Sequence, residues 1–246
     1  MRNACLLILV GCLFPQWSGA EELAGAGDAG PAVTVTAARN PQWLSYRHAY
    51  RAMKAWQAYD KAKDLLLPRL VLYPAAPHGS SKGIQLRLVG KQGSTVIPLD
   101  SALRAEIPVD DAAYEEDAEL VLNRPSGTYR SKYVLFIADH PDQVYPVERL
   151  REACRQAYEF HTTSSLFGKL QLLGKQCTGI LFMYRTRHVT PVVTHVAPDG
   201  GRNPVTEIRT SKSLQMLEVI HRFSAAASNG AILLEQAPDA IMALIE

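Results

Sequence analysis

Histidines and carboxylates are the side chains best able to carry out chemistry, so their spacing is considered first. The seven histidines include no pair at i, i+4 on a helix or at i, i+2 on a strand, the spacings that bring two imidazoles to one metal ion. His188 and His195 are seven residues apart on a predicted strand, which places them on opposite faces. We therefore expect no metal site and no cofactor.

The acidic run around Asp110 and Glu115 is the next candidate, because carboxylate oxygens are calcium ligands. It lacks the glycine and the regular alternation of a calcium loop, so we predict a solvated loop between two strands. The sequence also contains no G-x-S-x-G, H-E-x-x-H, C-x-x-C or G-x-G-x-x-G motif. These absences favour a non-catalytic protein, although catalytic groups are assembled in space and the enzyme alternative stays open.

Basic residues form the main candidate binding site. They recur at i, i+4, i+7 and i+14 on the first predicted helix: Arg47, Arg51, Lys54 and Lys61. Such a stripe would bind anionic lipid headgroups, lipopolysaccharide or an acidic partner. The competing interpretation is a solvated helix face whose charge Asp60 and Asp64 partly offset. An aromatic stripe on the same helix is predicted to pack on the strands: Tyr46, Tyr50, Met53 and Trp56.

The N-terminus is typical of exported proteins. Residues 1–20 contain one arginine, an apolar run and a small-residue site at Ser18-Gly19-Ala20, which together predict a signal peptide and a periplasmic protein. A second interpretation is a lipobox at Leu9-Val10-Gly11-Cys12, which would make the protein an outer-membrane lipoprotein anchored through Cys12. No later stretch is long and apolar enough to span a bilayer.

Removal of residues 1–20 would leave two cysteines, Cys154 and Cys177. In an oxidising compartment this pair predicts one disulfide, with Cα atoms within about 7 Å. The alternative is two free buried thiols. The formal net charge of +2, or +1 without Arg2, argues against nucleic acid as the main partner.

The elements expected around these residues divide the chain into four segments: a signal peptide at 1–20, a flexible leader at 21–40, a helix with strands at 41–140 and a mixed region at 141–246. Asn40-Pro41 predicts the start of the first helix and Pro68 its end. Alternating apolar residues then predict short antiparallel strands, near Leu70, Leu86, Ala105, Leu120 and Tyr133.

The mixed region begins with helical spacing over residues 147–160, continued by a weaker helix over 164–173. Residues 178–184 are apolar on both faces, which predicts a buried central strand. Asp199-Gly200-Gly201 predicts a hairpin turn between two strands. Residues 213–223 and 238–245 are predicted to be helical.

Part of this pattern resembles a group of exported proteobacterial proteins of unassigned function. The resemblance covers about residues 42–185 and includes Ala58-Tyr59-Asp60, Ile97-Pro98-Leu99-Asp100, the strand from Ala118 to Asn123 and Leu150 to Cys154. The strand block is also loosely similar to transthyretin-like and carboxypeptidase-regulatory-type sandwiches, a likeness that implies a non-catalytic module. We expect an α+β fold and a binding or assembly module that faces another cell-envelope component. The alternative is a periplasmic hydrolase acting on peptidoglycan or polysaccharide.

Overall fold

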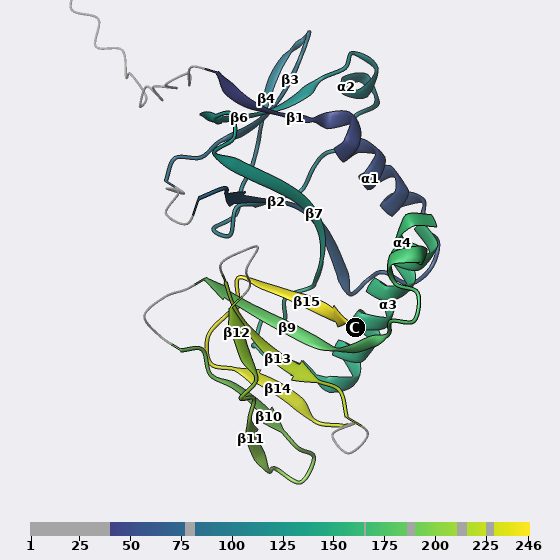
Figure 1. Ribbon diagram of the computed structural model, residues 1–246, viewed down its shortest axis with the longest axis vertical. Coiled ribbons are helices and arrows are strands. Elements are labelled where there is room, and N and C mark those ends of the chain that lie inside the picture. Colours follow the sequence, from purple (N-terminus) through teal and green to yellow (C-terminus); the bar gives the residue numbers. More distant parts are fainter. Residues whose placement is uncertain (1–39, 77–81, 165, 186–189, 211–215, 225–228) are drawn as a thin grey trace, which may run out of the picture. The chain divides into compact units, whose positions relative to one another are not determined.

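The computed structural model describes residues 40–76, 82–164, 166–185, 190–210, 216–224 and 229–246. Within these ranges the chain forms fifteen strands and four helices, and the paired strands are antiparallel (Figure 1). The fold is therefore α+β with antiparallel sheets, as predicted. The predicted signal peptide, the predicted leader up to residue 39 and His188 lie outside the described residues.

The first sheet has the order β1-β6-β3-β4. Its strands are β1 (Pro41–Ser45), β6 (Glu119–Pro125), β3 (Leu86–Gly90) and β4 (Gly93–Ile97). Alternation puts Leu86, Leu88, Leu120 and Leu122 on the inner face, where all four are buried. The side chains between them form an outer face.

The second sheet has the order β5-β2-β7, from β5 (Arg104–Ala105), β2 (Leu66–Pro74) and β7 (Tyr129–Ile137). Pro68 was predicted to end a helix and instead lies inside β2. The strand tolerates a proline there because β5 pairs only with Leu70 and Val71, so β2 has a neighbour on one side alone at Pro68.

Both of these sheets contribute to one hydrophobic core, which makes the strand block sandwich-like. The core contains Leu86 and Leu122 from the first sheet and Leu70 and Leu72 from the second. The side chain of Gln42 on β1 also connects the two sheets by hydrogen bonds to β7. Its amide donates to the carbonyl of Tyr129 at 2.6 Å and accepts from the N–H of the same residue at 3.0 Å.

The first helix is shorter than predicted and is not the first element. Pro41–Ser45 pairs with β6 as a strand, and the helix α1 spans Tyr46–Ala58. Ser45 is its N-cap, accepting a hydrogen bond from the N–H of His48, in place of Asn40. At the other end Lys63 donates to the carbonyls of Trp56 and Tyr59, both at 2.6 Å. These bonds cap the last carbonyls of the helix, which therefore ends at Ala58 and not at Pro68.

The predicted acidic loop is in part a second helix, α2 (Asp111–Glu115), capped by the Asp110 carboxylate. The predicted helices after residue 146 are confirmed as α3 (Val147–Ser164) and α4 (Leu166–Gln171). The buried central strand is confirmed as β9 (Cys177–Arg185).

Two further sheets follow residue 143. One has the order β11-β10-β14-β8, from β11 (Arg202–Pro204), β10 (Val193–Val196), β14 (Ala231–Leu234) and β8 (Val144–Pro146). The predicted turn at Asp199-Gly200-Gly201 joins β10 to β11. The other has the order β12-β13-β9-β15, from β12 (Ile208–Thr210), β13 (Met216–Arg222), β9 and β15 (Ala240–Ile245).

The helices predicted at 213–223 and 238–245 are therefore wrong within the described residues. Both segments flank β9 as strands, and β13 buries four consecutive residues, Glu218 to His221. A strand buried on both faces loses the alternation that identifies strands, so its apolar spacing resembles that of a helix.

The predicted disulfide is confirmed. Cys154 of α3 and Cys177 at the start of β9 are bonded, with Cα atoms 6.0 Å apart. Close by, Leu150 and Ala153 of α3 pack on Ile180 and Phe182 of β9 in a second core. The bridge therefore fastens the helix to the sheet that it covers.

Candidate functional site

The predicted basic stripe does not form one helical surface. Arg47, Arg51 and Lys54 lie on α1, whereas Lys61 is exposed in the turn beyond its end. The expectation that all four share a helix face is wrong, because the helix ends at Ala58 and its carbonyls are capped by Lys63.

Two of these cations are held by acidic residues at α2. The Arg47 Nε lies 2.5 Å from the Asp117 carboxylate, and the Lys54 Nζ lies 3.0 Å from the Asp111 carboxylate. Sequence reasoning assigned the offsetting charge to Asp60 and Asp64, which are near in the chain. Here it comes from residues more than fifty positions away, so only the fold reveals these partners.

Tyrosines fill the space between these charges. The rings of Tyr50 and Tyr114 stack with centroids 4.3 Å apart, and the Arg47 guanidinium lies 4.7 Å above the Tyr114 ring. Tyr50 donates its hydroxyl hydrogen to Asp111, and that bond together with Lys54 lowers the pKa of the Asp111 carboxyl group. The cluster fastens α2 to α1, and anion binding by the four basic residues stays a prediction.

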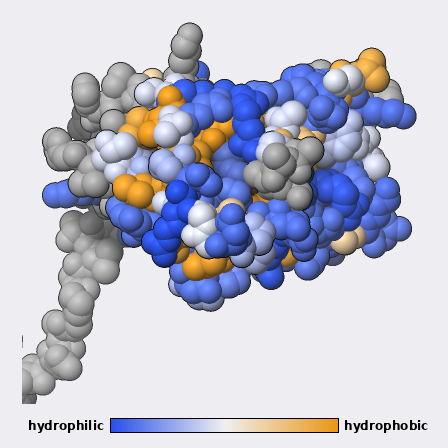
Figure 2. Space-filling model, turned by 90° about the horizontal axis from the view of Figure 1, so that it is seen from below, coloured by the Kyte–Doolittle hydropathy of each residue, from blue (hydrophilic) through white to orange (hydrophobic). Residues whose placement is uncertain are grey.

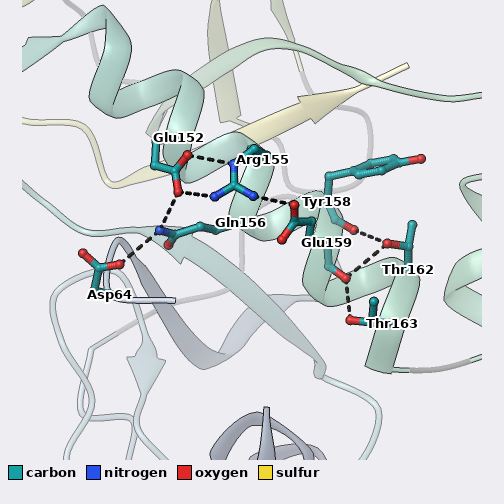
Figure 3. A network of polar contacts seen from close by, with 8 residues as sticks. All are labelled: Asp64, Glu152, Arg155, Gln156, Tyr158, Glu159, Thr162 and Thr163. Atoms are coloured by element: carbon teal, nitrogen blue, oxygen red, sulfur yellow. Dashed lines mark hydrogen bonds and ion pairs between the residues drawn. The ribbon is translucent and has the colours of Figure 1, made fainter. Parts of the chain in front are cut away.

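A second polar network lies along α3 (Figure 3). Gln156, which is 2% exposed, accepts from the Leu65 N–H at 3.2 Å. Its amide nitrogen donates to Asp64 at 3.0 Å and to Glu152 at 3.1 Å. Two carboxylates therefore share one amide group, and the turn before β2 is connected to α3.

The charges in this network are compensated by an arginine. Arg155 donates to both oxygens of Glu152, at 2.8 and 2.5 Å, and also forms an ion pair with Glu159 (Figure 3). The hydrogen bonds from Arg155 lower the pKa of the Glu152 carboxyl group. A glycosidase acid needs the opposite shift, because it must hold a proton near neutral pH.

A histidine pair connects the last two sheets. The rings of His195 on β10 and His221 on β13 have centroids 5.6 Å apart, and Arg151 of α3 lies over the nearby Phe223 ring. Burial, then the neighbouring His195 and Arg151, lower the pKa of His221 to about 4. His221 is therefore neutral at pH 7. Sequence spacing did not identify this pair, because its members are 26 positions apart.

The outer face of the first sheet carries a row of three apolar side chains and one arginine, in which the two end residues are exposed and the two middle residues are half-buried. Register places four side chains side by side across the strands: Trp43, Val121, Arg87 and Val96. Trp43 is 52% exposed and Val96 is 50% exposed. We call these four residues the outer row. Sequence reasoning placed Trp43 in a helix, so the row was missed.

The outer row crosses a sheet whose neighbouring strands lie about 4.8 Å apart. Its one charged member, Arg87, donates to the Ser94 hydroxyl at 3.0 Å. An exposed tryptophan and an exposed valine can bury apolar area against a partner. On the face shown in Figure 2, hydrophobic residues form patches among hydrophilic ones.

Two further observations complete the description of the site. No three histidine, cysteine, aspartate or glutamate side chains of the described ranges gather as a metal site. None of the helices in the same ranges has the length and apolar character needed to cross a membrane.

The chain was compared with protein-family models, with curated proteins and with solved structures, and nothing matched.

Proposed function

We propose that this protein is exported to the cell envelope and acts there as a non-catalytic binding or assembly module, with the outer row as its contact surface. The exposure of Trp43 and Val96 in the outer row is the observation that carries the proposal. An exposed tryptophan is a common anchor in protein interfaces, because its ring buries a large area with few rotatable bonds.

The disulfide supports the exported location, because bonds of this kind persist in oxidising compartments. The N-terminal pattern of residues 1–20 supports it independently. The proposed partner is another envelope protein, which would cover the exposed Trp43 and exclude water from it.

A photocrosslinking amino acid at position 43 tests the proposal in intact cells. We expect a discrete crosslinked species from position 43. The matched control is position 173, because Leu173 is another exposed apolar residue, 77% exposed, outside the outer row. Equal products from both positions, or none from position 43, would contradict the proposed contact surface.

A second candidate function is a periplasmic hydrolase acting on peptidoglycan or polysaccharide. One observation favours it: the carboxylates of Asp64 and Glu152 are close enough to share the Gln156 amide. Paired carboxylates of this kind are the usual equipment of glycosidases. The lowered pKa of Glu152 counts against a role as general acid.

The test of this alternative uses isolated peptidoglycan and the purified protein. If the pair is catalytic, the release of soluble fragments falls at least a hundredfold in Asp64→Asn and in Glu152→Gln. Fragment release that neither substitution changes, or no release by the wild-type protein, excludes this pair as the catalytic residues.

A further inference from the structure

The strand β4 forms one edge of the first sheet. It spans Gly93–Ile97 and pairs only with β3 among the described strands. The residues Gly93, Ser94, Thr95 and Val96 are exposed. An edge strand in this position presents backbone groups that can pair with another strand.

Register shows which backbone groups face outward. Gly90 and Gly93 pair across the two-residue turn at Lys91-Gln92, and residues that close such a turn form a hydrogen-bonded pair. Hydrogen-bonded and non-hydrogen-bonded pairs alternate along an antiparallel ladder, so Thr95 also bonds to β3. The N–H and C=O groups of Ser94 and Val96 therefore point away from β3, toward the free edge.

Edge strands are usually protected by charges, prolines, bulges, short length or a covering element. The opposite edge, β1, begins with Pro41 and has a register shift there. The edges β11, β12 and β7 carry arginines, β8 and β5 are three and two residues long, and β15 lies against β7. Within the described part of the chain, the five residues of β4 include no charge and no proline, and its pairing with β3 has no register shift.

We propose that β4 pairs with β4 of a second copy of this chain, in an antiparallel register centred on Thr95. In this register Ser94 of each copy lies opposite Val96 of the other. The four outward groups of each strand then form four intermolecular hydrogen bonds about a two-fold axis. The two first sheets join into one continuous sheet of eight strands.

The side chains of β4 suit a second copy in this register. Thr95 meets Thr95 of the second copy, and threonine pairs are favourable across strands. Gly93 meets Ile97, so the glycine leaves room for the larger side chain. Val96 meets Ser94 on the outer face, which reduces the exposure of the valine.

Charge also permits this pairing. On the outer face, Arg87 of β3 extends its guanidinium to the Ser94 hydroxyl of β4, at 3.0 Å. In the proposed register the two Ser94 residues are about 8 Å apart, so the two guanidinium groups are about one Debye length apart, and their repulsion in water costs no more than about 0.5 kcal/mol. Val96 belongs to both the outer row and β4, but the inference does not rest on the proposed function, because it depends on the backbone groups of β4 and not on Trp43.

The first test is the molar mass of the purified protein, measured by light scattering over a range of concentrations. We expect a concentration-dependent doubling of the mass. Val96→Pro removes an outward N–H, and Val96→Lys places a charge on the edge, so each should weaken dimerisation at least tenfold. Val96→Thr and Trp43→Lys are matched controls, in which the dimer should persist.

A wild-type protein that keeps the monomer mass up to millimolar concentration would overturn the inference. So would folded Val96→Lys and Val96→Pro variants, with unchanged circular dichroism, that dimerise as well as the wild-type protein.

The second test examines the register and does not depend on those variants. Thr95→Cys places two thiols in a non-hydrogen-bonded pair with Cα atoms about 4.5 Å apart, within the reach of a disulfide. We expect mild oxidation to give a covalent dimer. In Ser94→Cys the corresponding atoms are about 8 Å apart, so little dimer should form. Equal crosslinking of both variants, or none in Thr95→Cys, would exclude this register.

Discussion

Two buried glutamines connect distant parts of the chain at the level of single residues. Gln42 bonds to both backbone groups of Tyr129, and Gln156 bonds to Leu65, Asp64 and Glu152. A buried amide is stable only when its donors and acceptors are satisfied, so each glutamine also determines where its partners lie.

Gln156→Leu should lower the free energy of unfolding by about 1 to 3 kcal/mol. Leucine fills a similar volume but leaves the Leu65 N–H without its acceptor, and an unsatisfied buried donor is costly. Urea denaturation measures this change. The matched control is Gln57→Leu at an exposed position of α1, which should change the free energy by less than about 0.5 kcal/mol. Equal effects of the two substitutions would contradict the role of Gln156.

His221 should make stability depend on pH. Its pKa is lowered to about 4 in the folded protein, whereas an unfolded histidine has a pKa of about 6.5. Between these values the unfolded chain binds more protons than the folded one, so stability falls as the pH drops from about 6.5 toward 4. The loss should reach about 2 to 3 kcal/mol.

His221→Gln should remove most of this pH dependence, as measured by thermal or urea unfolding from pH 4 to 7. His48→Gln removes an exposed imidazole of α1 and should leave the dependence in place. A slope that is the same in wild type and His221→Gln would show that other groups cause it.

At the scale of elements, distant partners determine where helices and strands end. α1 begins where β1 stops pairing with β6, and it ends where Lys63 caps its carbonyls. α2 is held against α1 by ion pairs and stacked tyrosines. The disulfide holds α3 against β9, and these two elements also share the second core.

Loss of the disulfide should destabilise the protein by roughly 3 kcal/mol, because the bridge closes a loop of about 24 residues and restricts the unfolded chain. The double variant Cys154→Ala, Cys177→Ala compared with the oxidised wild type by urea denaturation measures this difference. Reduction of the wild type should give a similar loss. A difference below about 1 kcal/mol, or a wild type that reducing agent does not affect, would contradict a stabilising role.

At the scale of the whole molecule, the sandwich-like block with its outer row and the later sheets with their disulfide lie within residues 40–246. The proposed export depends on residues 1–20, which lie outside the described ranges. An exported protein would fold, and form its disulfide, after removal of this segment.

Processing after Ala20 should give a mature protein that begins at Glu21 and is released with the periplasmic fraction. Intact-mass analysis of the protein purified from cell fractions checks both points. An acylated mass that retains Cys12, together with a membrane-bound fraction, would instead identify the lipoprotein alternative.

The sequence alone determined features that depend on neighbours in the chain. The alternating leucines of β3 and β6, the turn at Asp199-Gly200-Gly201 and the helix over Val147–Ser164 follow from local patterns. The disulfide was also predictable, because only Cys154 and Cys177 remain once residues 1–20 are removed, so each has a single possible partner. Local periodicity and composition are sufficient for such features.

Only the tertiary structure decided the features that depend on distant partners. Residues 240–245 carry good helix formers, yet they form a strand because β9 offers its backbone groups along their whole length. Trp43 lies in the outer row because Pro41–Ser45 pairs with β6 as a strand. Lys61 does not share a helix face with the other three basic residues because α1 ends at Ala58. Strand pairing exchanges hydrogen bonds between residues far apart in the chain, and this contribution outweighs local preferences of a few tenths of a kcal/mol per residue.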